Sequence, residues 1–92
     1  MDFDWNKEKN SWLKVKRSIS FEDVVDAIEN EEVLDDYIHP NQERYPNQRI
    51  MVVWVNEYAY LVPYMKQRGI MFLKTVIPSR KARKTYVKQR KE

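Results

Sequence analysis

Three cationic side chains lie close together in the stretch FLKTVIPSRKA, residues 72–82 of this 92-residue chain: Lys74, Arg80 and Lys81. Clustered cations bind anions such as phosphate, and the free N–H groups at the start of a helix favour the same ligands. If a helix begins within this stretch, the sequence therefore predicts a phosphate-binding site there.

A strand followed directly by a helix would bring these cations together. Residues 72–77 have the β-branched and aromatic composition of a strand. Proline fixes φ and has no N–H, so Pro78 is expected to end the strand, and Ser79 is a typical residue to cap a helix. The two cations that follow would then lie in the first helical turn, close to Lys74 at the strand exit.

The stretch HPNQERYPNQR, residues 39–49, is a second candidate binding segment. It contains two prolines and no aliphatic residue, so it is expected to form a surface loop. His39, Arg44 and Arg49 would be available there for hydrogen bonds to bases and phosphates. Surface loops without such a role are also polar, and that alternative stays open.

The composition argues against several kinds of catalysis. The chain has one histidine, one glycine and no cysteine, so it lacks the parts of a zinc site, a cysteine nucleophile or a glycine-rich phosphate loop. Asp35, Asp36 and His39 do not have the spacing of a known ligand set, and neither a metal nor a cofactor is expected. Cleavage of RNA without a metal is a reaction that this composition allows. The 2′-hydroxyl of RNA itself attacks the neighbouring phosphate, so the protein only has to align the reacting groups, stabilise charge and move protons.

Charge is distributed unevenly along the chain. Residues 1–48 contain 6 Lys and Arg against 12 Asp and Glu, a net charge of −6, whereas residues 49–92 contain 11 against 2, a net charge of +9. The basic half suits a polyanion or an acidic protein. Arg83 and Lys84 join Lys81 there as candidate RNA contacts. A solvated basic helix without a partner is the alternative.

Two helices and two short strands are expected before the main sheet, the first strand over residues 3–5, where apolar and acidic residues alternate. Asn6 can cap the first helix, and Ser20 with Asp23 has the spacing of a capping box for the second. Residues 33–38 predict the second strand. The buried side of the first helix is expected to consist of Trp12, Leu13 and Val15. The apolar stripe of the second helix consists of Phe21, Val24, Val25 and Ile28.

The signal for strands is strongest over residues 50–77. Three strands with turns at residues 56–57 and 65–69 predict an antiparallel meander. Pro63 is expected to disturb the middle strand, which would leave Tyr64 free to point elsewhere. The final helix has a packing face made of Ala82, Tyr86 and Val87.

These elements predict one α+β domain spanning residues 1–92. N-terminal helices would pack on a small antiparallel β-sheet, a three-stranded meander plus one or two short strands, and a basic helix would end the chain. A chain of this size has room for a single core. The absence of cysteine suits a reducing compartment, and no apolar run approaches the roughly 20 residues of a membrane span. We expect a soluble, cytoplasmic protein that does not enter a membrane.

The chain resembles the BrnT-type toxins, small ribonucleases of the RelE/ParE superfamily found in bacterial toxin–antitoxin pairs. The resemblance covers nearly the whole chain and is carried, in order, by FDWNKEKN, ISFEDVVDAIEN, HPNQERYPNQRI, YLVPY and FLKTVIPSRKARKTY. Arg80 and Ala82 match the arginine and alanine of the family's Ser-Ala-Arg-x-Ala segment.

The resemblance implies the toxin of a type II toxin–antitoxin system. Such a protein is a hydrolase that cleaves RNA without metal to arrest growth, on or off the ribosome, and it binds a ribbon-helix-helix antitoxin encoded beside it. Arg80 would stabilise the transition state, and Lys74 and Lys81 would position the phosphate. Candidates for moving protons or aligning the substrate are Tyr64, Arg44 and His39.

The chain departs from the family pattern in three places. Lys16, Arg17 and Ser18 stand where the family usually has Lys-His-Gly, Pro78 replaces a serine, and Lys74 lies one position before the usual arginine. These departures leave two other functions open. One is a non-catalytic or gyrase-directed member of the superfamily, and the other is a nucleic-acid-binding module whose affinity depends strongly on salt.

Overall fold

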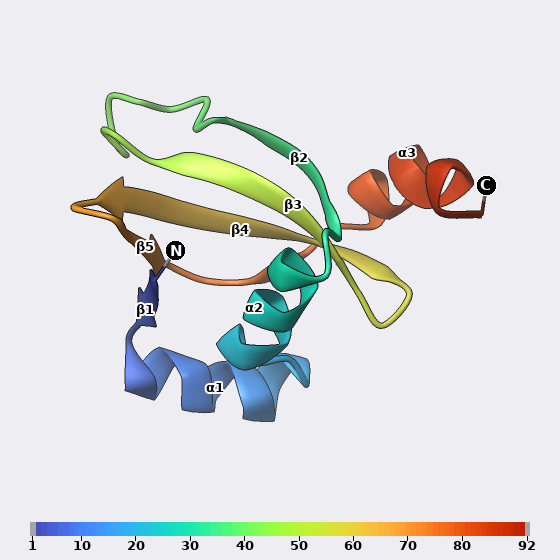
Figure 1. Ribbon diagram of the computed structural model, residues 1–92, viewed down its shortest axis with the longest axis horizontal. Coiled ribbons are helices and arrows are strands. Elements are labelled where there is room, and N and C mark those ends of the chain that lie inside the picture. Colours follow the sequence, from blue (N-terminus) through green and yellow to red (C-terminus); the bar gives the residue numbers. More distant parts are fainter. Residues whose placement is uncertain (1, 92) are drawn as a thin grey trace.

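The described chain, residues 2–91 of a computed structural model with side chains up to residue 88, folds as three helices and six strands. In chain order these are β1 (Asp2–Trp5), α1 (Lys7–Arg17), α2 (Phe21–Glu29), β2 (Val33–Ile38), β3 (Arg49–Val55), β4 (Tyr58–Gln67), β5 (Ile70–Leu73), β6 (Ile77–Pro78) and α3 (Arg80–Lys91). The strands form one sheet in the order β1-β5-β4-β3-β2, with β6 beside β4 (Figure 1).

The sheet is mixed, because one strand at its edge is parallel. β3, β4 and β5 form the predicted antiparallel meander, and β2 lies antiparallel to β3. At the other edge β1 runs parallel to β5, with Phe3 opposite Met71. The α+β class is confirmed, but the expectation of a purely antiparallel sheet is wrong at β1. Alternating residues predict a strand and carry no information about a partner far away in the chain.

Two tight turns connect the strands of the meander. Asn56 and Glu57 have φ values of 50° and 63°, and Arg68 and Gly69 have φ values of 54° and 78°. Two consecutive left-handed residues form the hairpin turn whose twist matches that of the flanking strands. The second turn is shorter than expected, so β4 continues to Gln67.

Pro63 marks the point at which β4 changes its neighbour. β5 pairs with β4 on one side of this residue and β6 on the other side. The Pro63 carbonyl accepts the N–H of Lys74 at 2.8 Å, so the missing N–H of Pro63 faces the same side, and pairing with β3 continues unbroken. The strand expected over residues 72–77 is therefore divided, since β5 ends at Leu73 and β6 begins at Ile77.

Both N-terminal helices begin where the sequence predicts their caps. The Asn6 side chain accepts the N–H of Lys9 at 2.8 Å. Ser20 accepts the N–H of Asp23 at 3.1 Å, and the Asp23 carboxylate accepts the N–H of Ser20 at 3.0 Å. These bonds satisfy N–H groups that have no partner within the helix.

Apolar side chains pack on both faces of the sheet, but the two faces are covered unequally. The larger core lies against α1 and α2 and includes Leu13, Phe21, Val53, Val62 and Leu73. The other face carries a smaller cluster against α3, made of Val52, Trp54, Ala59 and Ala82 with Tyr86 and Val87 packed against it, as predicted for the last helix. In Figure 1, α3 lies at the end of the molecule away from β1 and the β4–β5 hairpin. Among the described elements, no helix covers that end of the second face.

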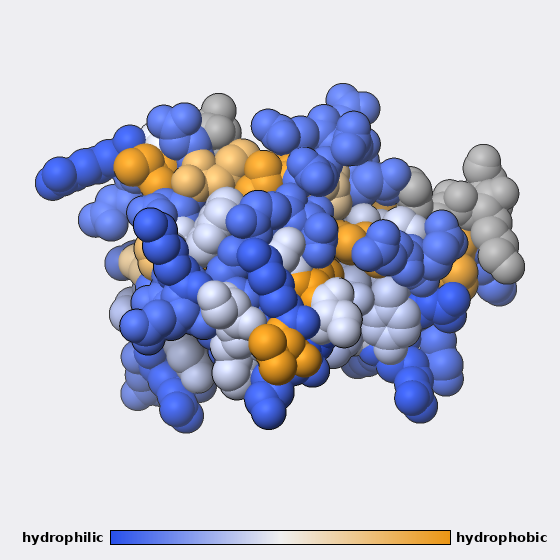
Figure 2. Space-filling view, turned by 90° about the horizontal axis from the view of Figure 1, so that it is seen from below, coloured by the Kyte–Doolittle hydropathy of each residue, from blue (hydrophilic) through white to orange (hydrophobic). Residues whose placement is uncertain are grey.

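α1 buries a different side from the one expected. Leu13 is fully buried, but Trp12 is 40% exposed and Val15 is 78% exposed, so the expectation was wrong for both. The residue buried instead is Asn10, whose side chain accepts the N–H of Phe21 at 2.8 Å. A polar side chain therefore joins α1 to α2, which no hydrophobic stripe can reveal. Seen from below, this helical side of the molecule shows scattered hydrophobic side chains among hydrophilic ones (Figure 2).

Asn10→Ala should lower the free energy of unfolding by about 1–3 kcal/mol, because the buried N–H of Phe21 would lose its acceptor. Urea unfolding followed by circular dichroism measures the change. Ser11→Ala, at an exposed position of the same helix, is the control and should change the free energy by less than about 0.5 kcal/mol. Equal midpoints for the two variants would show that Asn10 does not join the helices.

Candidate functional site

The start of α3 forms as the sequence predicts. The Ser79 hydroxyl accepts the N–H of Ala82 at 3.1 Å, which caps the helix. The N–H of Ser79 donates to the Ala59 carbonyl at 3.0 Å and so ties the junction to β4. Arg80 and Lys81 are exposed in the first helical turn.

The segment between β5 and β6 carries Lys74 and is held from several sides. Besides the bond from the Lys74 N–H to Pro63, Arg17 of α1 donates through Nη1 to the Val76 carbonyl at 2.6 Å. The Val76 side chain is fully buried. The Lys74 ammonium lies 4.9 Å from the centre of the Phe72 ring, a cation–π contact that holds the charge over the sheet face on which Phe72 lies.

Lys74 lines a hollow of about 310 Å³ between the loop over residues 39–48 and the segment that follows β5. We call it the smaller hollow. Its lining includes His39, Tyr45, Gln48, Pro63, Lys74 and Thr75. The structure therefore brings together two of the predicted site residues, His39 and Lys74, which are far apart in the sequence.

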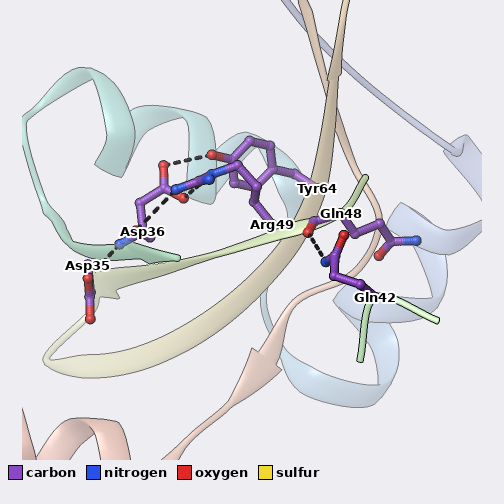
Figure 3. A network of polar contacts seen from close by, with 6 residues as sticks. All are labelled: Asp35, Asp36, Gln42, Gln48, Arg49 and Tyr64. Carbon is purple, nitrogen blue, oxygen red and sulfur yellow. Dashed lines mark hydrogen bonds and ion pairs between the residues drawn. The ribbon is translucent and has the colours of Figure 1, made fainter. Parts of the chain in front are cut away.

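The loop itself orients the His39 ring. The N–H of Asn41 donates to Nδ1 of His39 at 3.0 Å, so the neutral ring carries its proton on Nε2. The ring packs against Tyr45 with 4.5 Å between the ring centres. The Gln42 side chain donates to the His39 carbonyl at 2.8 Å. It also donates to the Gln48 carbonyl at 3.0 Å (Figure 3), and the two bonds close the loop.

A second hollow, of about 550 Å³, adjoins the first and is called the larger hollow. Its apolar lining consists of Met65, Ile70 and Phe72. Its charged lining includes Asp4, Arg68 and Lys74. Lys74 is thus shared by the two hollows, on the part of the sheet face that α3 leaves uncovered.

The three cations of the stretch over residues 72–82 lie in two different places. The N–H of Lys74 binds Pro63 of β4, whereas Pro78 pairs with Tyr60 of the same strand. These two points on β4 are three residues apart, a distance of about 10 Å along a strand. Arg80 and Lys81 line neither hollow. β6 lies between the strand exit and the helix, and its residue Ile77 lines the smaller hollow together with Lys74.

Tyr64 and Arg49 lie on the opposite face of the sheet, in a network with Asp36 (Figure 3). Tyr64 is 3% exposed, and its hydroxyl donates to Asp36 at 2.6 Å. Nε of Arg49 forms an ion pair with Asp36 at 3.0 Å. The network connects β2, β3 and β4, so Tyr64 is not freed by Pro63 as the sequence had indicated.

The surroundings of Tyr64 make its hydroxyl a weak acid. Burial, followed by the hydrogen bond to Asp36, raises the pKa of Tyr64 to about 12. A phenol that keeps its proton to such a high pH is a poor base near neutral pH. The hydrogen bond to Asp36 also raises the pKa of Arg49. Tyr64 and Arg49 therefore hold the strands of the sheet together in this structure.

The remaining predicted RNA contacts lie outside the hollows. Nε of Arg83 donates to the Glu57 carbonyl at 3.0 Å, and its guanidinium lies 5.6 Å from the centre of the Tyr58 ring, so it joins α3 to the β3–β4 turn. Lys84 is exposed on α3. Arg44 is exposed in the loop, 5.4 Å from the centre of the Tyr45 ring.

Sequence reasoning missed the apolar residues that line the larger hollow. Phe72, Met65 and Ile70 have the composition of ordinary strand residues, and alternation does not show which face lacks a cover. The contact from Arg17 to the segment after β5 also has no local signal, because its partner is far away in the sequence. Only the proline and the two turns indicated that the strands change partners near this site.

No helix in the described part of the chain is long and apolar enough to cross a membrane. The described residues contain no group of three or more His, Cys, Asp or Glu side chains that could hold a metal ion. Comparison with known proteins finds no matching family model, no matching curated protein and no matching solved structure.

The contribution of Tyr64 to stability should disappear between about pH 10 and pH 12. Its pKa is raised from 10.0 to about 12 in the folded protein, so the folded state holds the proton more tightly than the unfolded chain does. The stabilisation is complete below the unfolded pKa and is lost as the pH rises through the folded pKa. Tyr64→Phe has no such proton and should show a flatter decline.

Urea unfolding of the two proteins at several pH values from about 9 to 12 measures this difference. Every other tyrosine is present in both proteins, so their titration cancels in the comparison. The same pH dependence for both proteins would contradict a raised pKa at Tyr64.

Proposed function

We propose that this chain is a metal-independent endoribonuclease and the toxin of a type II toxin–antitoxin pair, of the BrnT type. The observation that carries the proposal is the lining of the smaller hollow, which includes both the only histidine of the chain and Lys74. An imidazole N–H and an ammonium on an uncovered sheet face supply hydrogen-bond donation to the leaving oxygen and charge stabilisation, which favour cleavage of RNA by its own 2′-hydroxyl.

In the proposed reaction, the 2′-oxygen of one nucleotide forms a bond to the adjacent phosphorus. The bond from phosphorus to the 5′-oxygen of the next nucleotide breaks, leaving a 2′,3′-cyclic phosphate and a free 5′-hydroxyl. Lys74 stabilises the negative charge that grows on the non-bridging oxygens. The N–H at Nε2 of His39 donates a hydrogen bond to the leaving 5′-oxygen and stabilises its developing charge. The 2′-hydroxyl gives its proton to water, and water returns a proton to the leaving 5′-oxygen.

The exposed cations of α3 bind the RNA backbone in this proposal. Arg80, Lys81 and Lys84 lie along one helix and line neither hollow, so they hold phosphates that flank the bond that breaks. Arg80 therefore has a binding role here, in place of the transition-state role that the resemblance implies.

Two departures from the family pattern have a structural explanation that supports the proposal. Ser18 has a φ of 54° at the end of α1, the left-handed conformation that favours glycine, and glycine is the residue that the family usually has there. Arg17 stands in place of the usual histidine and binds the segment that carries Lys74.

The proposed partner is a ribbon-helix-helix antitoxin, in a cytoplasm that both proteins share. An acidic or amphipathic segment of the antitoxin would cover the basic surface of α3, whose first turns carry four cations: Arg80, Lys81, Arg83 and Lys84. Opposite charge on the two partners would speed their association and make it sensitive to salt.

Purified protein should cleave single-stranded RNA in the presence of a metal chelator. Lys74→Ala and His39→Ala should each lower the cleavage rate by about 100-fold or more, because each removes a donor that stabilises charge developing in the transition state. Gel electrophoresis of labelled RNA measures the rate, and the chemistry of the cut ends identifies the cyclic phosphate.

Lys66→Ala is the matched control, since Lys66 is an exposed lysine of β4 that lines neither hollow. It should cleave at the wild-type rate. RNA that stays intact with wild-type protein, both with and without ribosomes, would overturn the proposed activity.

Arg80→Ala tests where the reaction takes place. This variant should raise KM several-fold and leave kcat within about twofold of wild type, because it removes binding that is equal in the substrate and the transition state. A loss of kcat as large as that of Lys74→Ala would place the reaction at the start of α3.

A nucleic-acid-binding or gyrase-directed protein without nuclease activity is the second candidate. It is favoured by the commitment of Tyr64 and Arg49 to the Asp36 network, which leaves few groups for catalysis. Salt-dependent RNA binding without cleavage would identify the first of these functions, and inhibition of gyrase the second.

A further inference from the structure

The two hollows follow each other along β4. Pro63 lines the smaller hollow and Met65 lines the larger one. Residues two apart on a strand point to the same face and are separated by about 7 Å. The hollows therefore adjoin on one face of the sheet, and Lys74 belongs to the linings of both.

The linings of the two hollows suit flat ligands. The larger hollow offers the Phe72 ring with aliphatic side chains beside it, and the smaller hollow offers the packed rings of His39 and Tyr45. Nucleobases stack on such surfaces whatever their sequence. The smaller hollow also has Gln48 in its lining, and an amide side chain hydrogen-bonds the edge of an unpaired base.

The wall of the smaller hollow contains a further polar group. The Thr75 hydroxyl is buried and makes no hydrogen bond within the described part of the chain. Buried polar groups are normally satisfied by protein, water or a ligand. A small shift of this wall around a bound base would give the hydroxyl a partner.

We infer that the two hollows bind the bases of two consecutive nucleotides of single-stranded RNA, with the phosphate that joins them on Lys74. The inference rests on the proposed function, since it names the substrate of the same site. An ammonium shared by two adjoining base sites is placed to bind the phosphodiester between them. The volumes of about 550 and 310 Å³ lie within the usual range for ligand sites.

The arrangement selects single strands. Bases in a duplex are paired and stacked on their neighbours, so neither one can enter a hollow of the protein. Two bases turned towards the sheet require a strand that is unpaired at both nucleotides. The site therefore accepts loops and free ends of RNA.

The test uses an adenosine dinucleotide that is methylated at the 2′-oxygen, so that its phosphodiester cannot be cleaved. Two further ligands each lack one base, at the 5′ or at the 3′ nucleotide. Isothermal titration calorimetry with the full-length protein measures the affinity for each ligand. Phe72→Leu removes the ring of the larger hollow, and Tyr45→Leu removes a ring of the smaller hollow.

Each variant should bind the dinucleotide about tenfold more weakly than wild type, the effect of losing one stacked base. Phe72→Leu should not change the affinity for the ligand that lacks the base bound in the larger hollow. Tyr45→Leu should not change the affinity for the other ligand, which lacks the base bound in the smaller hollow. Tyr58→Leu is the matched control, because Tyr58 lines neither hollow, and it should bind like wild type.

Thermal unfolding shows whether each variant is folded. If a ring substitution prevents folding, Ile70→Ala, at an exposed position, tests the larger hollow, and Gln48→Ala, which removes an amide but no ring, tests the smaller one. The inference is overturned if the variants bind like Tyr58→Leu, or if both effects disappear with the same ligand. If the protein cleaves RNA but does not show this binding pattern, the two base sites are contradicted and the proposed nuclease activity stands. If the protein shows the binding pattern but does not cleave RNA, the nuclease activity is contradicted and the base sites stand.

Discussion

The missing N–H of Pro63 is the constraint on which the rest of the structure depends. It faces the side of β4 on which β5 lies, and β5 ends beside it. The chain then leaves the sheet, is held by the Pro63 carbonyl and by Arg17, and rejoins β4 as β6. In this segment Lys74 lies outside the strand pairing of β4 and β5. Ser79 then binds the Ala59 carbonyl at the point where α3 begins. Because Pro63 lacks an N–H, Lys74 lies beside the hollows whereas Arg80 and Lys81 lie on α3.

Unequal covering of the two sheet faces explains why a site is available at all. α1 and α2 bury one face with large apolar residues. α3 has only Ala82, Tyr86 and Val87 to offer the other face, because its remaining described side chains are charged or polar. A helix of this kind covers one end of the sheet and leaves the other end to solvent (Figure 1). The two hollows occupy that uncovered end.

Burial distinguishes the polar residues that stabilise the fold from those that can bind a ligand. Tyr64 and Asn10 are buried and hydrogen-bonded across elements, so their polar groups are already used in the fold. His39 and Lys74 lie at the surface of a hollow and keep groups with which to bind a ligand. The sequence presents Tyr64 and His39 alike, as candidates for moving protons, and only their partners in the structure distinguish them.

Local features of this protein follow from its sequence by itself. The caps at Asn6, Ser20 and Ser79 and the turn at Asn56 depend on residues within a few positions, so residue type and spacing are sufficient to predict them. The α+β class and the packing face of α3 follow from periodicity in the same way. Tertiary structure alone decided the parallel position of β1, the bond from Tyr64 to Asp36 and the presence of His39 and Lys74 in the lining of one hollow. These depend on strand register and on which face a helix covers, and both are set by contacts between residues that are distant in the chain.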